Sequence, residues 1–510
     1  MKYLKIILII QILVTSCTNV LDREPLDIIS DAVVWDDEVL VDAYINDIYS
    51  RMIFQYNDQA QSPGGRNYSY LINIVSDQAT NARNWSGTVN QWAAGLLDET
   101  GGWENWHYDN IRRTNEFFDR IEGSTLADEI KNGFIGRVKL ARALFYFTMV
   151  KWYGGLPIID KAQSIDQSIE ELQVPRNTEK EVYDFIIAEC DDIIQENLLP
   201  EEAERVGDPS VYVAHALKSR AALYAASIAR WGTVQNNGIN GIPANAEMTY
   251  WQICYDASKA IMDGPFSLYN EVSGDLAENY RMMSLDESNS EIIWAKYYDG
   301  VEVSNDWSAD NGLIGTAPSW MTENICPFLE FIEDFETVDG TIEPWDRDEI
   351  SNGLWTYDEL FGDLEPRFHA MIYTQGSNWS GFDNIQYYNG IRKEDGIIVR
   401  SGIVNGISAV GSNYRTSGRS FSGFAIKKGV DPSVSTQSSI GDVQKIQFRL
   451  GEILLNFAEA AFYLDRNEES LDAINQIRAR VGLPGHTEID EDKIRHERKI
   501  ELAFEENRHW

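Results

Sequence analysis

Cysteine, histidine and basic residues are scarce in this chain, and each scarcity argues against a class of protein. Of its 510 residues, four are cysteine and six are histidine, and no two histidines show the His-x-x-x-His spacing of a zinc site. Lys and Arg number 43 against 81 Asp and Glu, which leaves a net charge of −38. A surface this acidic repels phosphate groups, so nucleic acid and the surface of an anionic membrane are disfavoured as partners.

The few cysteines indicate a protein that is not held together by disulfides. Cys190, Cys254 and Cys326 lie inside the chain, so at most one pair can form among them. The patterns around Cys190 and Cys254 are helical, and we expect both to be small buried side chains. The fourth cysteine, Cys17, stands in a different context.

The chain also lacks an apolar run long enough to cross a bilayer, and its one early run predicts a signal instead. A short basic start precedes the apolar residues 6–14, interrupted by Gln11, whereas a spanning helix needs ~20 residues. Residues 14–17 (Val-Thr-Ser-Cys) place small residues before a cysteine, as in a bacterial lipoprotein cleavage site. We therefore expect Cys17 to become a lipidated N-terminus held to a membrane by acyl chains. A plain secreted protein is the alternative.

Hydrophobic periodicity predicts a helical frame interrupted by two loop-rich regions. Residues 57–104 and 265–445 are rich in Gly, Asn, Ser and aromatic residues, and only short strands are expected in the second region. Thr178 followed by Glu181 is a capping box, and residues 154–157 (Gly-Gly-Leu-Pro) end a helix. We expect helices at 37–52, 106–121, 129–152, 178–193, 209–231, 249–262, 447–464, 468–481 and 490–510.

Similar short sequences recur late in three of these helices. They are residues 142–146 (Arg-Ala-Leu-Phe-Tyr), 220–224 (Arg-Ala-Ala-Leu-Tyr) and, more loosely, 456–462 (Asn-Phe-Ala-Glu-Ala-Ala-Phe). Small residues one turn from bulky aromatic ones let helix pairs approach closely, as in tetratricopeptide repeats. Ordinary alanine-rich core helices without a true repeat are the alternative. The predicted fold is mostly α: a tetratricopeptide-like α-α superhelix with a large loop-rich insertion containing short strands.

These patterns predict five segments along the chain. We expect a signal peptide (1–16), a lipidated tether (17–35), a helical repeat frame (36–264) that includes an early ligand-binding loop region (57–104), an irregular ligand-binding insertion (265–445) and a C-terminal helical repeat segment (446–510).

A series of short motifs is spread along nearly the whole chain. They are residues 21–25 (Leu-Asp-Arg-Glu-Pro), 106–115 (Trp-x-Tyr-x-x-Ile-x-x-x-Asn), 142–157, 216–224, 365–368 (Glu-Pro-Arg-Phe), 449–460, 474–478 (Ile-Asn-Gln-Ile-Arg) and 497–505. No single motif is decisive, but their order and spacing are specific. Together they resemble the SusD/RagB family of Bacteroidetes outer-membrane lipoproteins.

The resemblance implies tetratricopeptide helix pairs that carry an irregular ligand-binding part. It also implies a lipid-anchored protein on the outer membrane, facing the cell exterior, that binds glycans or, in the RagB branch, peptides. Such proteins cap a TonB-dependent transporter of the SusC type and deliver ligand to it, and they do not catalyse a reaction. Family members usually continue past the last motif, whereas this chain ends at Trp510, so we expect a truncated C-terminal segment.

Two groups of aromatic residues with polar neighbours are the candidate binding residues. Sugar binding needs flat rings against C–H faces and polar groups for the hydroxyls, and the chain has 15 Trp and 24 Tyr. In the family, an early-loop cluster meets an insertion Tyr and Trp across one shallow groove. The two clusters here are Asp77, Asn81, Arg83, Trp85 and Trp92 in the early loop region, and Tyr297, Tyr298, Trp307 and Trp320 in the insertion.

Within these clusters we expect four rings to stack on sugar rings and two charged side chains to form hydrogen bonds with the sugar hydroxyls. The alternative is that the rings fill the core beneath long loops, since large rings are usually mostly buried. Four other tryptophans lie in helix or strand patterns, and we expect those to be core. The expected stacking residues are Trp85, Trp92, Tyr298 and Trp320, the bonding residues are Asp77 and Arg83, and the core tryptophans are Trp106, Trp152, Trp231 and Trp294.

Catalytic and cofactor motifs are few. Among 81 carboxylates no glycosidase pair can be singled out, and neither a Gly-x-Ser-x-Gly turn nor a phosphate-binding glycine loop is present. Residues 306–310 and 339–349 are acidic enough for a structural calcium ion but lack the EF-hand order. We therefore expect a glycan-binding protein with no enzyme activity and no cofactor. A peptide-binding protein, a surface glycosidase and a purely structural repeat scaffold are the alternatives.

Overall fold

The protein is described here by a computed structural model. It describes residues 34–52, 69–81, 106–312, 325–352, 355, 357–374, 377, 391–392, 398–399, 402–404, 407–409, 422–434 and 441–510. Cys17, and with it the expected lipidation, lies outside these residues.

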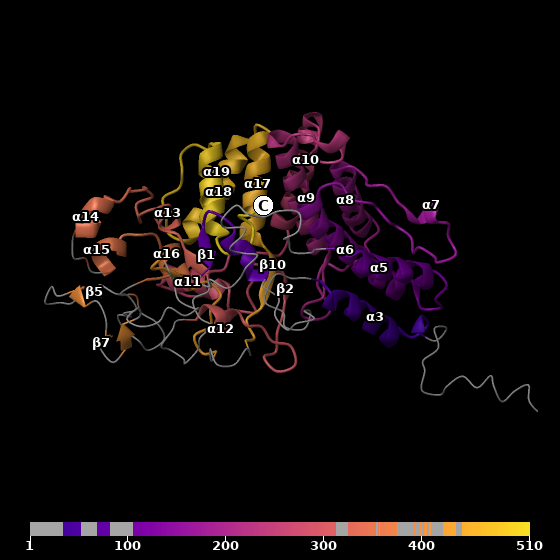
Figure 1. Ribbon diagram of the computed structural model, residues 1–510, viewed down its shortest axis with the longest axis horizontal. Helices are drawn as coiled ribbons and strands as arrows, with labels where there is room; N and C mark the ends of the chain where they lie inside the picture. The colour runs from indigo at the N-terminus through magenta and orange to yellow at the C-terminus, as the bar shows by residue number, and fades with distance from the viewer. Residues whose placement is uncertain are drawn as a thin grey trace, which may run out of the picture.

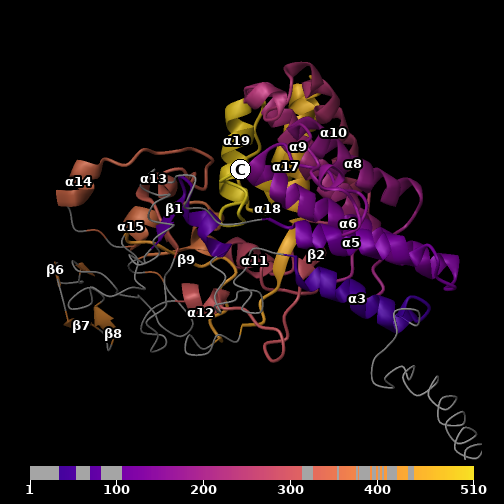
Figure 2. The same cartoon turned by 45° about the vertical axis from the view of Figure 1, so that its right-hand side comes forward.

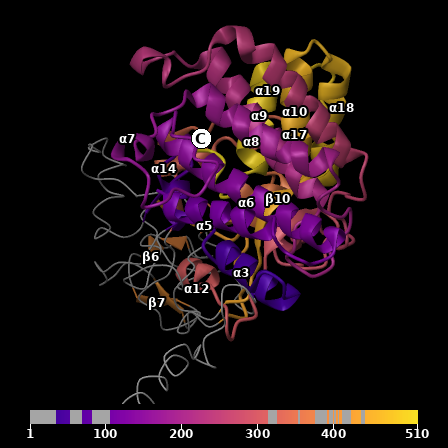
Figure 3. The same cartoon turned by 90° about the vertical axis from the view of Figure 1, so that its right-hand side faces the viewer.

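Helices that follow one another in sequence pack side by side and form the larger part of the molecule. Helix α6 packs on α8, α8 on α9, and α9 on α10, and the series continues from α10 to α17 and α18, although the whole insertion separates α10 from α17 in sequence. In Figure 1 the early helices lie on the right, in indigo to magenta, and the yellow C-terminal helices stand beside α10. Figure 3 shows α8, α9, α10 and α17 next to one another. The helices are α3 (Glu38–Ser50), α5 (Tyr108–Ile121), α6 (Asp128–Tyr153), α8 (Glu179–Gln195), α9 (Val211–Trp231), α10 (Glu247–Met262), α17 (Leu450–Tyr463), α18 (Asn467–Arg480) and α19 (Glu491–Glu501).

Small residues of the repeated sequences lie at the contacts between these helices. Their Cβ atoms are fully buried in one continuous hydrophobic core. At Gly136 in α6 the approach to the segment after α8 is close, because an added Cβ would lie 2.6 Å from the carbonyl oxygen of Leu198. The tetratricopeptide-like frame is therefore confirmed. The buried alanines include Ala143 in α6, Ala221 and Ala222 in α9, and Ala458, Ala460 and Ala461 in α17.

The ends of the helices follow the predicted signals. Thr178 accepts a hydrogen bond from the Glu181 backbone amide, and the Glu181 side chain bonds back to Thr178, so the capping box is confirmed. Gly154 ends α6 with a φ of 67°, a conformation that favours glycine. Asp37 caps α3 in the same way as a serine or threonine would, by accepting hydrogen bonds from the first backbone amides.

The part of the chain between α10 and α17 is built from short elements. Figures 1 and 2 place it on the left of the helical frame. Its described strands, together with β1 (Ala79–Asn81), pair as five antiparallel two-stranded sheets: β1–β3, β2–β10, β4–β9, β5–β6 and β7–β8. The elements are α11 (Leu276–Met283), β2 (Ile292–Lys296), α12 (Trp307–Asn311), β3 (Ile325–Pro327), α13 (Leu329–Ile332), α14 (Arg347–Asn352), α15 (Tyr357–Phe361), α16 (Pro366–Met371), β4 (Ile372–Tyr373), β5 (Ile391–Arg392), β6 (Ile398–Val399), β7 (Gly402–Val404), β8 (Ile407–Ala409), β9 (Ala425–Ile426) and β10 (Lys445–Arg449).

A second hydrophobic core lies under this irregular part. Phe331, Phe335 and Phe368 meet there edge to face, and Phe504 from the C-terminal segment joins them, with ring centroids 5.5 Å apart between Phe331 and Phe504. Residues that follow α18 and α19 thus fill the core beneath the insertion. The C-terminal segment therefore connects the two cores.

Several expectations about individual residues are corrected. Residues 447–449 belong to strand β10 rather than to a helix, because β10 pairs with β2 before α17 begins. Trp106 and Trp231 are 53% and 46% exposed, so neither is a core residue. Trp294 is buried as expected, and so are Cys190 and Cys254. Cys326 is buried as well, and none of the three forms a disulfide. In the described part of the chain no helix is both long and apolar enough to serve as a membrane span.

Candidate ligand-binding site

A short ribbon joins the early loop region to the insertion. Strand β1 pairs with β3 in an antiparallel register that sets Ala79 opposite Pro327 and Asn81 opposite Ile325. In an antiparallel pair, the end of one strand lies beside the start of the other. The chain therefore leaves β1 at Asn81 and enters β3 at Ile325 at the same end of the β1–β3 ribbon.

The two predicted clusters are attached to that end of the ribbon. Arg83 and Trp85 follow Asn81 in sequence, and Trp320 precedes Ile325. Arg83, Trp85, Trp92 and Trp320 lie outside the described residues, as does the side chain of Asn81, and their contacts with a ligand stay a prediction.

Hydrogen bonds from backbone and side-chain groups hold the ribbon against the C-terminal segment. The side chain of Gln78 donates to the carbonyl of Lys499 (2.9 Å), and the Phe328 amide donates to the Gln78 carbonyl (2.9 Å). The Asn73 side chain accepts from the Glu506 amide at 2.9 Å. Residues from three distant parts of the chain thus fix the position of one short ribbon.

Asp77 is the one residue of the predicted early cluster whose side chain is described, and it forms an ion pair. Arg508 donates to both of its carboxylate oxygens, at 2.7 and 2.6 Å, and Lys499 lies 3.3 Å away. The hydrogen bonds from Arg508 lower the pKa of Asp77 to about 2. Lys499 also pairs with Asp334 at 2.5 Å. Asp77 is therefore part of a charged clamp between the early segment, the insertion and the C-terminal segment.

Tyr298 and Trp307 are buried, which corrects the expectation that Tyr298 presents its ring to a sugar. They are 5% and 2% exposed, and both belong to the core under the insertion. The indole of Trp307 donates to the carbonyl of Lys428 at 3.2 Å. Burial raises the pKa of the Tyr298 hydroxyl. Tyr297, the residue before it, is half-buried. In this arrangement neither Tyr298 nor Trp307 offers a ring face to solvent.

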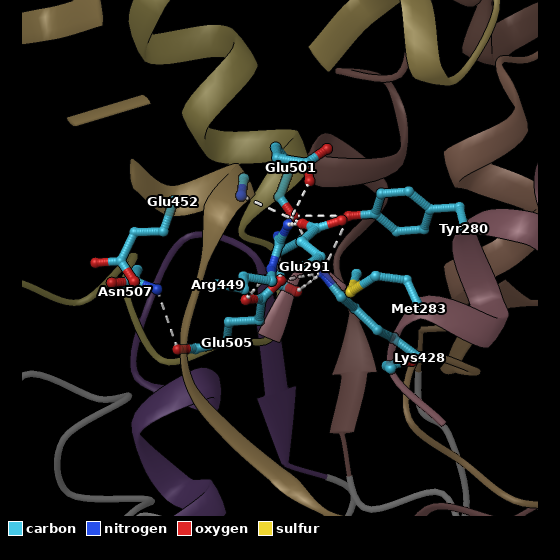
Figure 4. Close-up of polar contacts among 12 residues, drawn as sticks. Tyr280, Met283, Glu291, Lys428, Arg449, Glu452, Glu501, Glu505 and Asn507 are labelled. Carbon is cyan, nitrogen blue, oxygen red and sulfur yellow. Dashed lines mark hydrogen bonds and ion pairs between the residues drawn. The ribbon is translucent and has the colours of Figure 1, made fainter. Parts of the chain in front are cut away.

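The C-terminal segment that carries Arg508 also takes part in a buried ion network. Arg449 at the end of β10 donates to Glu291 at 2.7 Å and to Glu501 at 2.8 Å, and it binds Glu505 through two nitrogens at 2.9 and 2.7 Å. Lys428 reaches Glu505 from the other side at 2.5 Å. Figure 4 shows Arg449 surrounded by these carboxylates. Glu291 and Glu501 have no exposed surface, so both charges depend on protein partners.

Three more arginines extend this network through the molecule. Two of them come from α18 and one from α16, so the network joins the helical frame to the insertion. The Glu336 carboxylate is bound by two nitrogens of one guanidinium, at 2.9 and 2.8 Å. The pairs are Arg480 with Glu291 and Glu501, Arg367 with Glu365, Glu497 and Glu501, and Arg478 with Glu336 and Glu497.

Nearby positive charges lower the pKa values of three of these carboxylates, those of Glu336, Glu501 and Glu505. Burial would raise the pKa of Glu505, but the charges of Arg449 and Lys428 outweigh it and lower that pKa to about 2. The same balance holds the pKa of Glu501 well below its usual value. Burial lowers the pKa of the Lys428 ammonium to about 8.

The network was not predicted from the sequence, although a signal for it was present. Glu497 and Glu501 stand four residues apart and so share one face of α19. Ile494 and Ile500 of the same short helix are buried. Carboxylates on the apolar face of a helix indicate buried ion pairs, because an unpaired charge there is too costly.

A separate hollow of about 480 Å³ lies between α8, α9 and the C-terminal segment. Its lining includes Tyr183, Tyr224 and Arg498. None of the predicted site residues that the structure describes lines it, but Gln78, Lys499 and Arg508, which hold the ribbon and Asp77, do. Among the described residues, which include Asp306 and Asp310, no three His, Cys, Asp or Glu side chains gather as a metal site.

Comparison with known sequences finds two matching family profiles. The profile of the SusD family matches residues 290–510. A profile described as SusD-like and as starch-binding associating with outer membrane matches residues 21–230. Together they cover most of the chain. No curated protein sequence matches it.

Solved structures share the fold along nearly the full length. A SusD-like protein from Bacteroides fragilis is 27% identical, with a TM-score of 0.72 over 96% of this chain and 88% of that one. Surface glycan-binding protein A from Bacteroides uniformis is 15% identical, with a TM-score of 0.64 and coverages of 92% and 87%. A laminarin-binding SusD-like protein is 17% identical, with a TM-score of 0.63 and coverages of 93% and 90%.

Fold and profiles together define a SusD-like protein, with a helical repeat frame and an irregular insertion. The chain belongs to the SusD/RagB family. It is a member of a family of carbohydrate-binding proteins, and one of its matching profiles is described by association with the outer membrane.

Proposed function

We propose that this protein captures an oligosaccharide or polysaccharide at the cell surface and passes it to a TonB-dependent transporter of the SusC type. It holds the glycan without cleaving it. Membership of the SusD/RagB family supports this proposal, as do fold relatives described as glycan-binding and laminarin-binding.

The β1–β3 register is the observation on which the proposal rests. It brings the start of the segment with Arg83, Trp85 and Trp92 next to the end of the segment with Trp320. Two loop regions attached to one end of a ribbon can bind opposite sides of the same ligand. The clamp at Asp77 and the buried network behind it supply the rigid support that such loops need.

In the proposed site, indole rings stack on the C–H faces of sugars and polar groups bond the hydroxyls. Trp85, Trp92 and Trp320 are the proposed stacking residues, and Arg83 the proposed bonding residue. Because the Tyr298 ring is buried, we assign stacking to these three tryptophans alone. Each stacked ring contributes on the order of 1 kcal/mol, so affinity for a single short glycan is modest.

The proposed location is the outer face of the outer membrane, with acyl chains on Cys17 as the anchor. The sequence of the first residues and the description of the matching profile support it. An acidic chain with a net charge of −38 does not bind anionic headgroups by itself, so a covalent lipid is a suitable attachment.

Affinity electrophoresis tests the proposal. The protein is run in native gels that contain plant, host or microbial polysaccharides, and the same mixtures are assayed for new reducing ends. We expect slower migration with at least one neutral polysaccharide and no release of reducing ends. Reducing ends would identify a glycosidase instead. Saturable peptide binding without any retardation by glycans would identify a peptide-binding protein and overturn the proposal.

A further inference from the structure

Trp106 is a half-exposed indole at the start of α5, where the early loop region returns to the helical frame. The side chain is 53% exposed. Large rings are usually mostly buried, but a single exposed one is ordinary by itself, so the contacts of the Trp106 ring decide what it can do. Among the described residues, the only other tryptophan exposed to this degree is Trp231, at 46%.

Two tyrosines fix the orientation of this indole. The Tyr108 ring lies 4.9 Å from the Trp106 ring between centroids, and the Tyr153 ring lies 5.0 Å away at 85°, an edge-to-face contact. Such contacts hold a ring in one orientation. We call Trp106, Tyr108 and Tyr153 the aromatic platform.

The platform is anchored to the backbone of the turn that ends α6. The Tyr108 hydroxyl donates to the Pro157 carbonyl at 2.6 Å. The guanidinium of Arg176 donates to the carbonyls of Tyr153 and Gly155, each at 2.7 Å. Arg176 is itself exposed, and its Nη2 also donates to the Asn240 side chain at 3.2 Å. Its Nη1 therefore remains as the donor that can bond to a hydroxyl beside the backbone of Tyr153.

Trp231 provides an internal comparison, because its ring is already covered by cations. The Arg495 guanidinium lies 4.8 Å from the centroid of the Trp231 ring, and that of Arg230 lies 5.5 Å from it. No described cation lies over Trp106. Of the two exposed indoles in the described part of the chain, the one at the platform is therefore better placed to receive a ligand.

We propose that the aromatic platform is an additional subsite that stacks a sugar ring of a bound glycan on Trp106. This inference rests on the proposed function and extends it from the loops to the helical frame. Trp106 directly follows the loop region whose other end leaves the β1–β3 ribbon. The residue that ends this loop region in sequence thus presents a rigid aromatic surface to which a long glycan can extend. A neutral sugar suits the platform because the flat Trp106 ring can stack on its C–H face and the Arg176 guanidinium can donate to its hydroxyls.

The test compares three variants by affinity electrophoresis in gels of the polysaccharide that retards the wild-type protein most. Trp106→Ala removes the ring, Trp106→Phe keeps a smaller one, and Trp231→Ala is the matched control at an exposed indole covered by arginines. Thermal unfolding checks that all three fold. We expect binding to weaken about fivefold or more in Trp106→Ala, less in Trp106→Phe, and not at all in Trp231→Ala.

Three results overturn the inference, and they differ in what they say about the protein. If the wild-type protein is retarded and Trp106→Ala migrates identically, the platform is not a subsite, but glycan binding stands. If Trp231→Ala weakens binding as much as Trp106→Ala, exposed indoles act without regard to the platform geometry, and the inference fails. If no glycan retards the wild-type protein, the proposed function fails together with the inference.

Discussion

Arg508 and Asp77, which are 431 residues apart in sequence, form a two-pronged ion pair with donor–acceptor distances of 2.7 and 2.6 Å. Asp77 precedes the β1–β3 ribbon, and Arg508 follows α19, so the pair ties the start of the early loop region to the C-terminal segment. From the sequence, Asp77 was expected to bond sugar hydroxyls. In the structure, both of its oxygens are bound by Arg508, so its first role is to position the ribbon.

Substituting either partner of this pair distinguishes a role of Asp77 in positioning the ribbon from a role in binding sugar hydroxyls. If Asp77 positions the ribbon, Asp77→Asn and Arg508→Ala weaken glycan retardation to a similar extent. Both also lower the free energy of unfolding by about 1 kcal/mol or less, because the Asp77 side chain is 51% exposed. Affinity electrophoresis and urea unfolding measure the two effects. Loss of binding in Asp77→Asn alone would show that its carboxylate contacts the ligand directly.

The buried network predicts a large difference between two arginines of the same chain. The Arg449 side chain is 1% exposed and binds Glu291, Glu501 and Glu505, whereas the Arg347 side chain is 51% exposed and pairs with Glu333. Arg449→Met leaves buried carboxylates without a partner and is expected to cost about 3–5 kcal/mol of unfolding free energy. Arg347→Met, the control, is expected to cost about 0.5 kcal/mol or less. Equal losses in urea unfolding would show that the network does not hold the two parts together.

The same network predicts steep acid sensitivity. Glu336 and Glu505 have pKa values lowered to about 2 in the folded protein, and that of Glu501 is lowered well below 4.5. Groups with lowered pKa values stabilise the fold above their unfolded pKa and lose that contribution as pH falls from about 4.5 towards about 2. The melting temperature is therefore expected to fall sharply across this range. Arg449→Met is expected to flatten the fall, and a wild-type melting temperature that stays constant down to about pH 3 would contradict the prediction.

Glu506, which lies next to the network in sequence, acts in the opposite direction. Burial raises the pKa of Glu506 to about 7, so this carboxyl favours the folded state when protonated and weakens it as pH rises from about 4.5 to about 7. The Glu506 contribution therefore opposes that of the carboxylates with lowered pKa values, and the change of the melting temperature between about pH 4.5 and about pH 7 measures it.

Two glycines of α6 predict opposite effects of the same substitution. A Cβ at Gly136 would lie 2.6 Å from the Leu198 carbonyl oxygen, whereas one at Gly133 would meet nothing within 4 Å. Gly136→Ala is expected to destabilise the protein, because a backbone contact between α6 and residue 198 must open. Gly133→Ala is expected to stabilise it by about 0.5–1 kcal/mol through helix propensity. Chemical unfolding of both variants measures this, and stabilisation by Gly136→Ala would refute the close approach.

Local signals in the sequence were sufficient for the helical frame. The capping box at Thr178, the glycine that ends α6 and the apolar spacing along α9 act over a few residues, so a single chain reveals them. The exposure of Trp106 was not predictable in this way. A helical pattern does not say what packs on a residue that comes just before the helix begins.

The site depends on contacts between distant residues, which periodicity does not report. The pairing of Asn81 with Ile325, and of Asp77 with Arg508, joins residues hundreds of positions apart. The resemblance to a known family led to the expectation that the early cluster meets the insertion, and the ribbon brings the adjoining strands together. It did not indicate that Tyr298 is buried, because the burial of one ring depends on the packing of this particular core.

Calorimetric titration with oligosaccharides from a retarding polysaccharide tests most directly whether the two loop regions at the end of the β1–β3 ribbon bind glycan. The wild-type protein is compared with Trp85→Ala/Trp320→Ala and with Trp231→Ala as the control. We predict saturable binding by the wild-type protein and the control, and an affinity about tenfold lower or worse in the double variant. A folded double variant that binds as tightly as the wild-type protein would contradict a glycan site between these loops.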